Sequence, residues 1–254
     1  MKRPDGLHKA FRLQEITQEN YRTRSLRFDG PLRGAQPGQF VMMWLPQVGE
    51  RPYSISGADP FTLTVVAVGE FSEHMCRLMP GERVWVRGPL GAGYVLKGKH
   101  HLLAGGGYGS APLLFLAREA RKHGDVVHVC LGARTAQEVL LTDSFSAIGC
   151  HLHITTDDGS LGSQGLVTQA VSEVLSTNTI DTLYGCGPLP MLSALARVCR
   201  QVRLPHQLSW EALMRCGIGL CGSCELPEAV CRDAGIPTGW LACMDGPVFE
   251  HLPD

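Results

Sequence analysis

Three cysteines near the carboxyl end of this 254-residue chain have a spacing that suits iron–sulfur chemistry. Cys216, Cys221 and Cys224 follow the pattern C-x4-C-x2-C, and glycine and serine fill most of the gaps between them. Plant-type [2Fe–2S] sites use this spacing together with one distant fourth cysteine. Small residues allow backbone N–H groups to approach the sulfides, where hydrogen bonds help to set the potential. The spacing therefore predicts a [2Fe–2S] site held by these three thiolates.

The fourth ligand is either Cys231 or Cys243. We favour Cys243 because it follows a short apolar segment, residues 240–241, that could return the chain to the cluster. Four cysteines also suffice for structural zinc, but zinc ribbons usually pair two C-x2-C knuckles and this segment holds one. The other cysteines are predicted to be buried small apolar residues. They are Cys76, Cys130, Cys150, Cys186 and Cys199.

Two glycine-rich turns indicate a dinucleotide site. Residues 102–112 and 184–188 each read as a strand that ends in glycines and opens a helix. One such turn is also typical of a plain tight connection, but two on one parallel sheet form a nucleotide crevice at the carboxyl ends of the strands. The positions expected at the nucleotide are Gly105, Gly107, Gly109, Gly185, Gly187 and Pro188.

Two other polar positions near these turns have open interpretations. The acids of residues 155–160 could contact ribose hydroxyls or only cap the next turn. Arg134 follows another predicted strand and could contact a nucleotide phosphate. The choice between NAD and NADP is left open by the residues.

Residues 51–56, Arg-Pro-Tyr-Ser-Ile-Ser, could bind a flavin. Arg51 offers a charged fork for a phosphate, Tyr53 a ring face for an isoalloxazine, and Ser54 a hydroxyl for a ring heteroatom or phosphate. On chemistry alone, a strand edge with one surface arginine and one core tyrosine explains the same residues. Residue chemistry alone leaves both interpretations open.

The surrounding pattern predicts a β-barrel followed by an α/β domain. Short strands are expected at 8–16, 21–28, 39–45, 61–68 and 83–87, with a helix at 72–79. Strands at 101–104, 126–131, 151–155 and 182–184 alternate with helices at 110–122, 165–175 and 189–201, which implies a parallel sheet. The chain after Ser209 is cysteine-rich and irregular. We therefore expect an antiparallel barrel domain over 1–98, a parallel-sheet nucleotide-binding domain over 99–208 and a cluster module over 209–254.

Composition excludes several classes of protein. The formal net charge is −1, so no basic field favours nucleic acid or an anionic membrane. The longest apolar stretch, 102–117, is short of a membrane span. Residues 1–5 lead into a polar stretch rather than an apolar signal sequence. Ten cysteines in a chain this long, half of them clustered, indicate a cluster site in a reducing compartment, so a cytoplasmic protein is expected.

The motifs together resemble a known superfamily. The runs R-P-Y-S-I-S, G-G-G-Y-G-S-A-P and G-C-G-P, in this order, are similar to those of ferredoxin–NADP reductases over nearly the whole chain. Residues 214–224 with 243–249 narrow the resemblance to the electron-transfer subunits of class 1B dihydroorotate dehydrogenase.

That resemblance implies cofactors and the residues that bind them. FAD is implied at Arg51, Pro52, Tyr53 and Ser54, at the strand Val66, Ala67 and Val68, and at Phe71 and Ser72, where Gly-Thr is usual. It also implies Cys216, Cys221, Cys224 and Cys243 as the four cluster ligands.

The resemblance further implies a relay in pyrimidine biosynthesis. An FMN-containing catalytic subunit oxidises dihydroorotate, and electrons pass through [2Fe–2S] and FAD to NAD⁺, in a heterotetramer of two of each subunit. Nicotinamide exchanges hydride and a cluster exchanges single electrons, so a flavin belongs between them. The alternatives are the same chemistry for a sulfide dehydrogenase, hydrogenase or transhydrogenase partner, a self-sufficient reductase, or a non-enzymatic zinc module.

Overall fold

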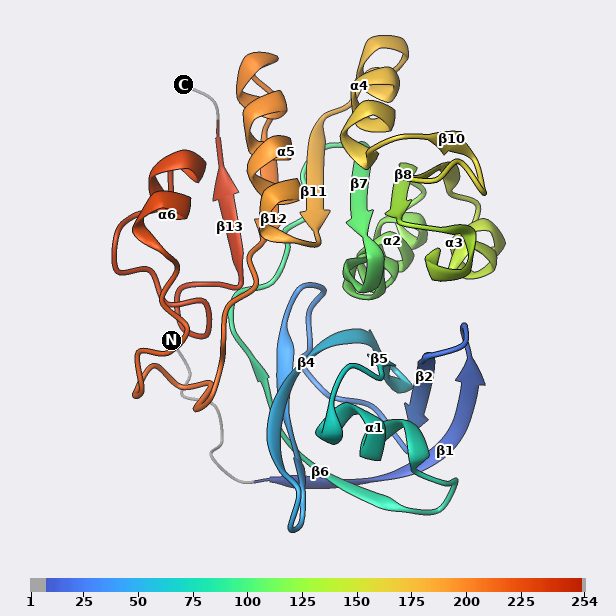
Figure 1. The fold of residues 1–254 in the computed structure, drawn as a ribbon, viewed down its shortest axis with the longest axis vertical. Coiled ribbons are helices and arrows are strands. Elements are labelled where there is room, and N and C mark those ends of the chain that lie inside the picture. The colour runs from blue at the N-terminus through green and yellow to red at the C-terminus, as the bar shows by residue number, and fades with distance from the viewer. Residues whose placement is uncertain (1–7, 253–254) are drawn as a thin grey trace.

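The amino-terminal strands close into a six-stranded antiparallel barrel, as the sequence predicts (Figure 1). The computed structural model describes residues 8–252. The barrel order is β1-β2-β5-β4-β3-β6. Its strands are β1 (Lys9–Gln18), β2 (Thr23–Phe28), β3 (Phe40–Leu45), β4 (Gly49–Ala58), β5 (Phe61–Val66) and β6 (Arg83–Leu90), and one helix, α1 (Glu70–Arg77), lies between β5 and β6.

Strict alternation of apolar and polar residues forms the barrel interior. In β5, Phe61, Leu63 and Val65 are buried while the threonines between them are half-buried. These side chains meet residues such as Phe11 and Phe28 in one core cluster. Alternation of this kind buries one face of the strand, and Phe71 and Met75 of α1 complete the core cluster.

A seven-stranded sheet follows, with order β10-β9-β8-β7-β11-β12-β13. Its strands are β7 (His100–Gly106), β8 (Val126–Ala133), β9 (His151–Thr156), β10 (Ser163–Gln164), β11 (Thr182–Cys186), β12 (His206–Ser209) and β13 (Val248–His251). The helices are α2 (Ser110–Lys122), α3 (Thr142–Ala147), α4 (Val167–Thr177), α5 (Leu189–Gln201) and α6 (Glu228–Ala234), with short 3-10 turns at Gly107–Gly109 and Ala136–Glu138.

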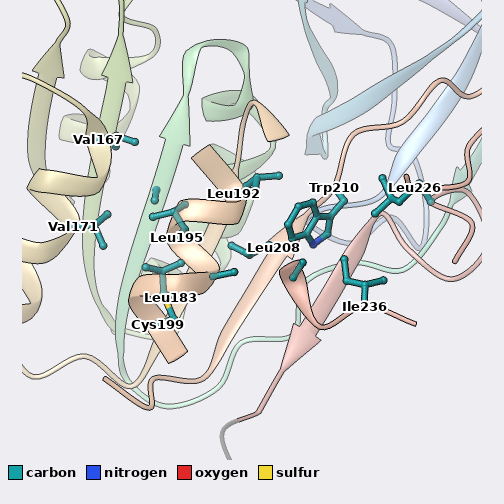
Figure 2. Close-up of a cluster of buried hydrophobic side chains, with 14 of the residues drawn as sticks. Val167, Val171, Leu183, Leu192, Leu195, Cys199, Leu208, Trp210, Leu226 and Ile236 are labelled. Atoms are coloured by element: carbon teal, nitrogen blue, oxygen red, sulfur yellow. The ribbon is translucent and has the colours of Figure 1, made fainter. Parts of the chain in front are cut away.

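Helices cover both faces of this sheet because its strands are apolar on both sides. Leu102 packs with residues of α4 and α5, whereas its neighbour Leu103 packs with α2 and α3. Figure 2 shows the first of these clusters, which continues from the sheet to Trp210, Leu226 and Ile236. Every strand pair from β10 to β12 is parallel, so the carboxyl ends of the strands share one edge.

The carboxyl-terminal segment adds a strand to the sheet. β13 pairs antiparallel with β12, from His206 opposite His251 to Ser209 opposite Val248. The sequence predicts only irregular structure here, because four-residue strands carry no readable periodicity. The domain boundaries at 98 and 208 remain a prediction, and β13 shows that residues after 209 complete the sheet before them. Among residues 8–252, no helix is long and apolar enough to cross a membrane.

Candidate functional site

Four cysteines of the carboxyl-terminal segment lie in two pairs. The sulfur atoms of Cys224 and Cys243 are 3.2 Å apart, and the backbone N–H of Gly219 donates to the Cys243 sulfur over 3.2 Å. Hydrogen bonds from Ser223 and then from Cys216 lower the pKa of the exposed Cys221 thiol to about 6. Cys216 and Cys221 therefore form the second pair, and a depressed pKa favours the thiolate that binds metal.

Paired thiols are the arrangement that a [2Fe–2S] cluster takes. A Cys₄ cluster has two protein ligands on each of its two irons, whereas one zinc ion requires all four ligands around a single point. Within residues 8–252, no three cysteine, histidine or acidic side chains already converge on such a point. Four thiols that include the close pair Cys224 and Cys243 match the donor set of a [2Fe–2S] cluster.

Cys231 and Cys243, the two candidates for the fourth cluster ligand, have different surroundings. Cys231 lies in α6, where its buried thiol donates to the Leu226 carbonyl over 3.7 Å. Of the other cysteines, Cys76, Cys130, Cys186 and Cys199 are buried and Cys150 is half-buried. Cys243, and not Cys231, faces Cys224.

The loop of residues 216–224, called the cysteine loop below, contacts the barrel. Arg87 of β6 donates to the Cys216 carbonyl over 2.8 Å and pairs with Glu50 of β4 over 3.0 Å. Burial works to raise the pKa of Glu50, but hydrogen bonds from Arg87 and His8 lower it overall. A Cβ on Gly217 would lie 2.9 Å from Met42 of β3, so this loop approaches the strand as only glycine permits.

A cleft of 760 Å³ contains most of the predicted flavin residues. We call it the flavin cleft. β4 contributes Arg51, Pro52, Tyr53 and Ser54. The end of β5 contributes Val66, the segment after it Val68, and α1 contributes Phe71 and Ser72, whereas Ala67 is not part of the wall. The Tyr53 and Phe71 rings are 6.1 Å apart, and Arg51 lies 5.9 Å from the centre of the Phe71 ring. The apolar surfaces and the Arg51 guanidinium of this wall suit a ring system that carries a phosphate.

Ser72 serves α1 rather than pointing freely into the cleft. Its hydroxyl accepts the N–H groups of Val68 and Gly69 at 2.9 and 3.0 Å and donates to the Gly69 carbonyl over 2.8 Å. The side chain fixes the turn that leads into α1. Its contribution to the cleft is therefore the shape of this turn.

The opposite wall of the flavin cleft comes from distant residues that sequence reasoning missed. Tyr108, Ala111 and Pro112 come from the first glycine-rich turn and α2, and residues 211–214 come from the segment between β12 and the cysteines. One signal was available, because Met214 stands two residues before the cluster motif.

A second cleft, of 560 Å³, lies at the carboxyl ends of the parallel strands. We call it the nucleotide cleft. Gly107 and Pro188 line it, together with Arg134 and Asp157, whose roles the sequence left open. Sequence reasoning missed other lining residues, among them Arg22, Glu138 and Met191. The position, a parallel-strand edge with glycines and both signs of charge, is where open α/β sheets bind dinucleotides.

The remaining predicted glycines do not line the nucleotide cleft. Gly105, Gly109, Gly185 and Gly187 are absent from its wall. Gly109 instead brings the two turns together, because a Cβ there would lie 2.2 Å from the Cys186 carbonyl oxygen. Gly109 therefore serves the packing of the two turns and not the wall of the cleft.

A flavin-suited barrel followed by a dinucleotide-suited sheet is the architecture of the ferredoxin reductase class. The structure of an NADH-dependent reduced ferredoxin–NADP oxidoreductase, described for flavin-based electron bifurcation, is similar with a TM-score of 0.82 and 27% identity, covering 94% of this chain and 87% of that one. The ferredoxin reductase of carbazole 1,9a-dioxygenase shares the fold, with a TM-score of 0.65 at 22% identity over 75% of this chain and 64% of that one.

Sequence comparison gives the family within that class. Residues 211–251 match the model of the iron–sulfur cluster binding domain of dihydroorotate dehydrogenase B. A probable electron transfer subunit of NAD⁺-dependent dihydroorotate dehydrogenase B from Methanocaldococcus jannaschii is 37% identical, covering 94% of this chain and 88% of the relative. A homologue of the same description from Thermococcus kodakarensis is 36% identical, covering 96% and 97%. The chain belongs to the family of dihydroorotate dehydrogenase B electron transfer subunits.

Proposed function

We propose that this chain carries electrons from a dihydroorotate-oxidising partner subunit to NAD⁺, as part of pyrimidine biosynthesis. FAD and a [2Fe–2S] cluster supply the conversion between single electrons and hydride when they are bound. The chain's own residues hold these groups in order. Cys216, Cys221, Cys224 and Cys243 hold the cluster, β4 and α1 hold the flavin, and the sheet edge holds the nucleotide.

One observation carries the proposal. Met214 lines the flavin cleft, and the first cluster cysteine, Cys216, follows it by two residues. Two residues span at most about 7 Å of chain. The flavin cleft also shares wall residues with the nucleotide cleft. The three sites therefore form one continuous path, which a relay needs and separate binding modules do not.

The partner is expected at the cysteine loop. Apolar side chains stand exposed around the thiols, with Leu220 at 80% and Leu213 at 65% exposure, and with Ile218 and Met244 more than a third exposed. Apolar groups gathered on one surface are typical of interaction sites. We propose that this surface contacts an FMN-containing catalytic subunit, and that two copies of each subunit assemble.

The first test is iron content. Protein purified without oxygen should show the absorption of a flavin with an iron–sulfur cluster and contain two irons per chain. Cys243→Ser should lower the iron content, because the change removes one thiolate of a pair. Cys231→Ser is the matched control, a buried cysteine of the same segment that should keep its iron. Equal iron loss in both variants would contradict the assignment of the fourth ligand.

The second test concerns electron flow. Cys221→Ser should abolish reduction of NAD⁺ by dihydroorotate in the reconstituted complex while the chain retains FAD. Retained flow in that variant, or loss of FAD with flow intact, would argue against the relay. Reconstitution with the catalytic subunit separates this function from the same chemistry with a sulfide dehydrogenase, hydrogenase or transhydrogenase partner.

A further inference from the structure

The flavin cleft and the nucleotide cleft meet at one place. Their walls share Val66, Val68 and Tyr108. Hydride transfer requires the reacting atoms to approach to about 3–3.5 Å. A nicotinamide held in one cleft must therefore reach a flavin held in the other through this junction.

At this junction, Tyr108 forms a hydrogen bond with a carboxyl group. The residue is 49% exposed, and its hydroxyl donates to Glu211 over 3.2 Å across 103 residues of sequence. Glu211 follows β12 and lines the flavin cleft. The thiol of Cys186, at the end of β11, is close enough for the charge of Glu211 to add to the effect of burial on its pKa.

Glu211 has no cationic partner among residues 8–252. Burial raises the pKa of its carboxyl, and the opposing influence is the single hydrogen bond from Tyr108. A partly buried carboxylate needs a compensating charge or several donors to be stable. One neutral hydroxyl leaves most of its acceptor capacity unused.

The two redox forms of the nucleotide differ in the charge of the ring that enters this junction. The nicotinamide ring of NAD⁺ carries a positive charge, and the dihydronicotinamide ring of NADH is neutral. A carboxylate beside the ring attracts the first form through its charge and the second only through hydrogen bonding.

We propose that Glu211, held by Tyr108, is the counter-charge for the oxidised nicotinamide ring and makes this site prefer NAD⁺ over NADH. The inference rests on the proposed function, since it places the nicotinamide at the junction. Glu211 then contacts the ring directly, and Tyr108 positions the carboxylate. A preference for the oxidised form favours loading of the acceptor and release of the reduced product.

Equilibrium binding tests this without turnover. Oxidised holoprotein is titrated calorimetrically with NAD⁺ and with 1,4,5,6-tetrahydro-NAD, whose ring is neutral and donates no hydride. The wild type should bind NAD⁺ the more tightly. Glu211→Gln should weaken NAD⁺ binding about tenfold, as expected for one charge pair near a protein surface, and change binding of the neutral analogue much less. Glu211→Asp should keep most of the preference because it keeps the charge.

The matched control is Glu119→Gln, the same charge change on α2 outside both of these clefts, and it should leave the binding ratio unchanged. Flavin and iron contents confirm that each variant is loaded. The proposal fails if Glu211→Gln weakens both ligands equally or neither, or if the wild type binds the neutral analogue more tightly. A loaded wild-type protein that binds neither ligand would instead contradict the proposed function.

Discussion

Single glycines determine whether the two nucleotide turns can meet. Gly109 has ordinary helical backbone angles, so its lack of a side chain serves contact rather than conformation. The nearest atom to a Cβ there is the Cys186 carbonyl oxygen, at 2.2 Å. Gly107 is the opposite case, with a φ of +54° and no protein atom within 4 Å of a Cβ. Gly109 therefore lets the two turns pack together, and Gly107 leaves room for a ligand.

Alanine at these two glycines should therefore have different consequences. Gly109→Ala forces backbone apart and should cost about 1–3 kcal/mol of unfolding free energy, as overpacking does. Gly107→Ala should cost about 1 kcal/mol for its left-handed backbone, yet weaken NAD⁺ binding strongly, because its methyl group enters the cleft. Thermal unfolding and calorimetric titration of both variants measure the two effects. A Gly109→Ala protein as stable as the wild type would contradict the packing argument.

Among the elements, β12 joins the sheet to the carboxyl-terminal segment. All four of its residues are buried although three are polar. Gln207 donates to the Val95 carbonyl over 2.8 Å and to Glu250 over 2.9 Å, and it accepts the Val95 N–H. His206 bonds to the Leu204 carbonyl, and its ring centre lies 5.0 Å from that of His251. Distant polar partners therefore add to the sheet pairing and the buried Leu208 in holding this strand.

His206 makes stability depend on pH. Burial lowers its pKa to about 4 from 6.5, with His251 and Arg200 adding to the shift. The unfolded chain then takes up a proton near pH 6.5 that the folded chain refuses until about pH 4. Stability is therefore complete above pH 6.5 and is lost as the pH falls through this window. The loss between pH 7 and pH 5 should be about 2 kcal/mol from this residue.

Urea unfolding of the wild type and of His206→Asn at both pH values isolates this contribution. Asparagine offers a donor for the Leu204 carbonyl but does not titrate. The variant should lose less stability on acidification, although burial also lowers the pKa of His128 and His153 and both proteins share that loss. The pKa values of Asp125 and Asp181 are also lowered, but these carboxyl groups affect stability only at a pH below this window. An identical pH dependence in both proteins would rule out His206 as a source.

Local patterns in the sequence were enough for some elements and not for others. The barrel strands can be predicted because each one buries its own row of apolar side chains, as β5 does. The alternation of strands and helices in the second domain can be predicted for the same reason. β4 was not predicted as a strand, although its middle carries the flavin motif, since Pro52 and charged neighbours hide its period. In the same way, cysteine spacing is local and readable, whereas the bond from Tyr108 to Glu211 forms only after folding.

At the scale of the whole molecule, contacts with both the sheet and the barrel position the cysteine loop. β13 joins the end of the chain to the sheet, and Arg87 joins Cys216 to the barrel. The Arg87 side chain is 12% exposed and bonds Glu50 through two nitrogens, at 3.2 and 3.0 Å. Charge-assisted, bidentate bonds of this kind are stronger than an exposed ion pair. Arg87 is thus one of the contacts that set the position of the loop relative to the flavin cleft.

Arg87→Leu should loosen the cysteine loop without emptying the flavin cleft. The change leaves the Cys216 carbonyl without its donor and Glu50 with His8 alone, which should cost about 1.5–3 kcal/mol for bonds to a charged group. We expect faster release of iron to a chelator and slower electron flow from the partner, with flavin content unchanged. Arg77→Leu, at an exposed i,i+4 pair with Glu73, is the control and should behave as the wild type. Iron release that is equally fast in both variants would show that the barrel contact does not hold the loop.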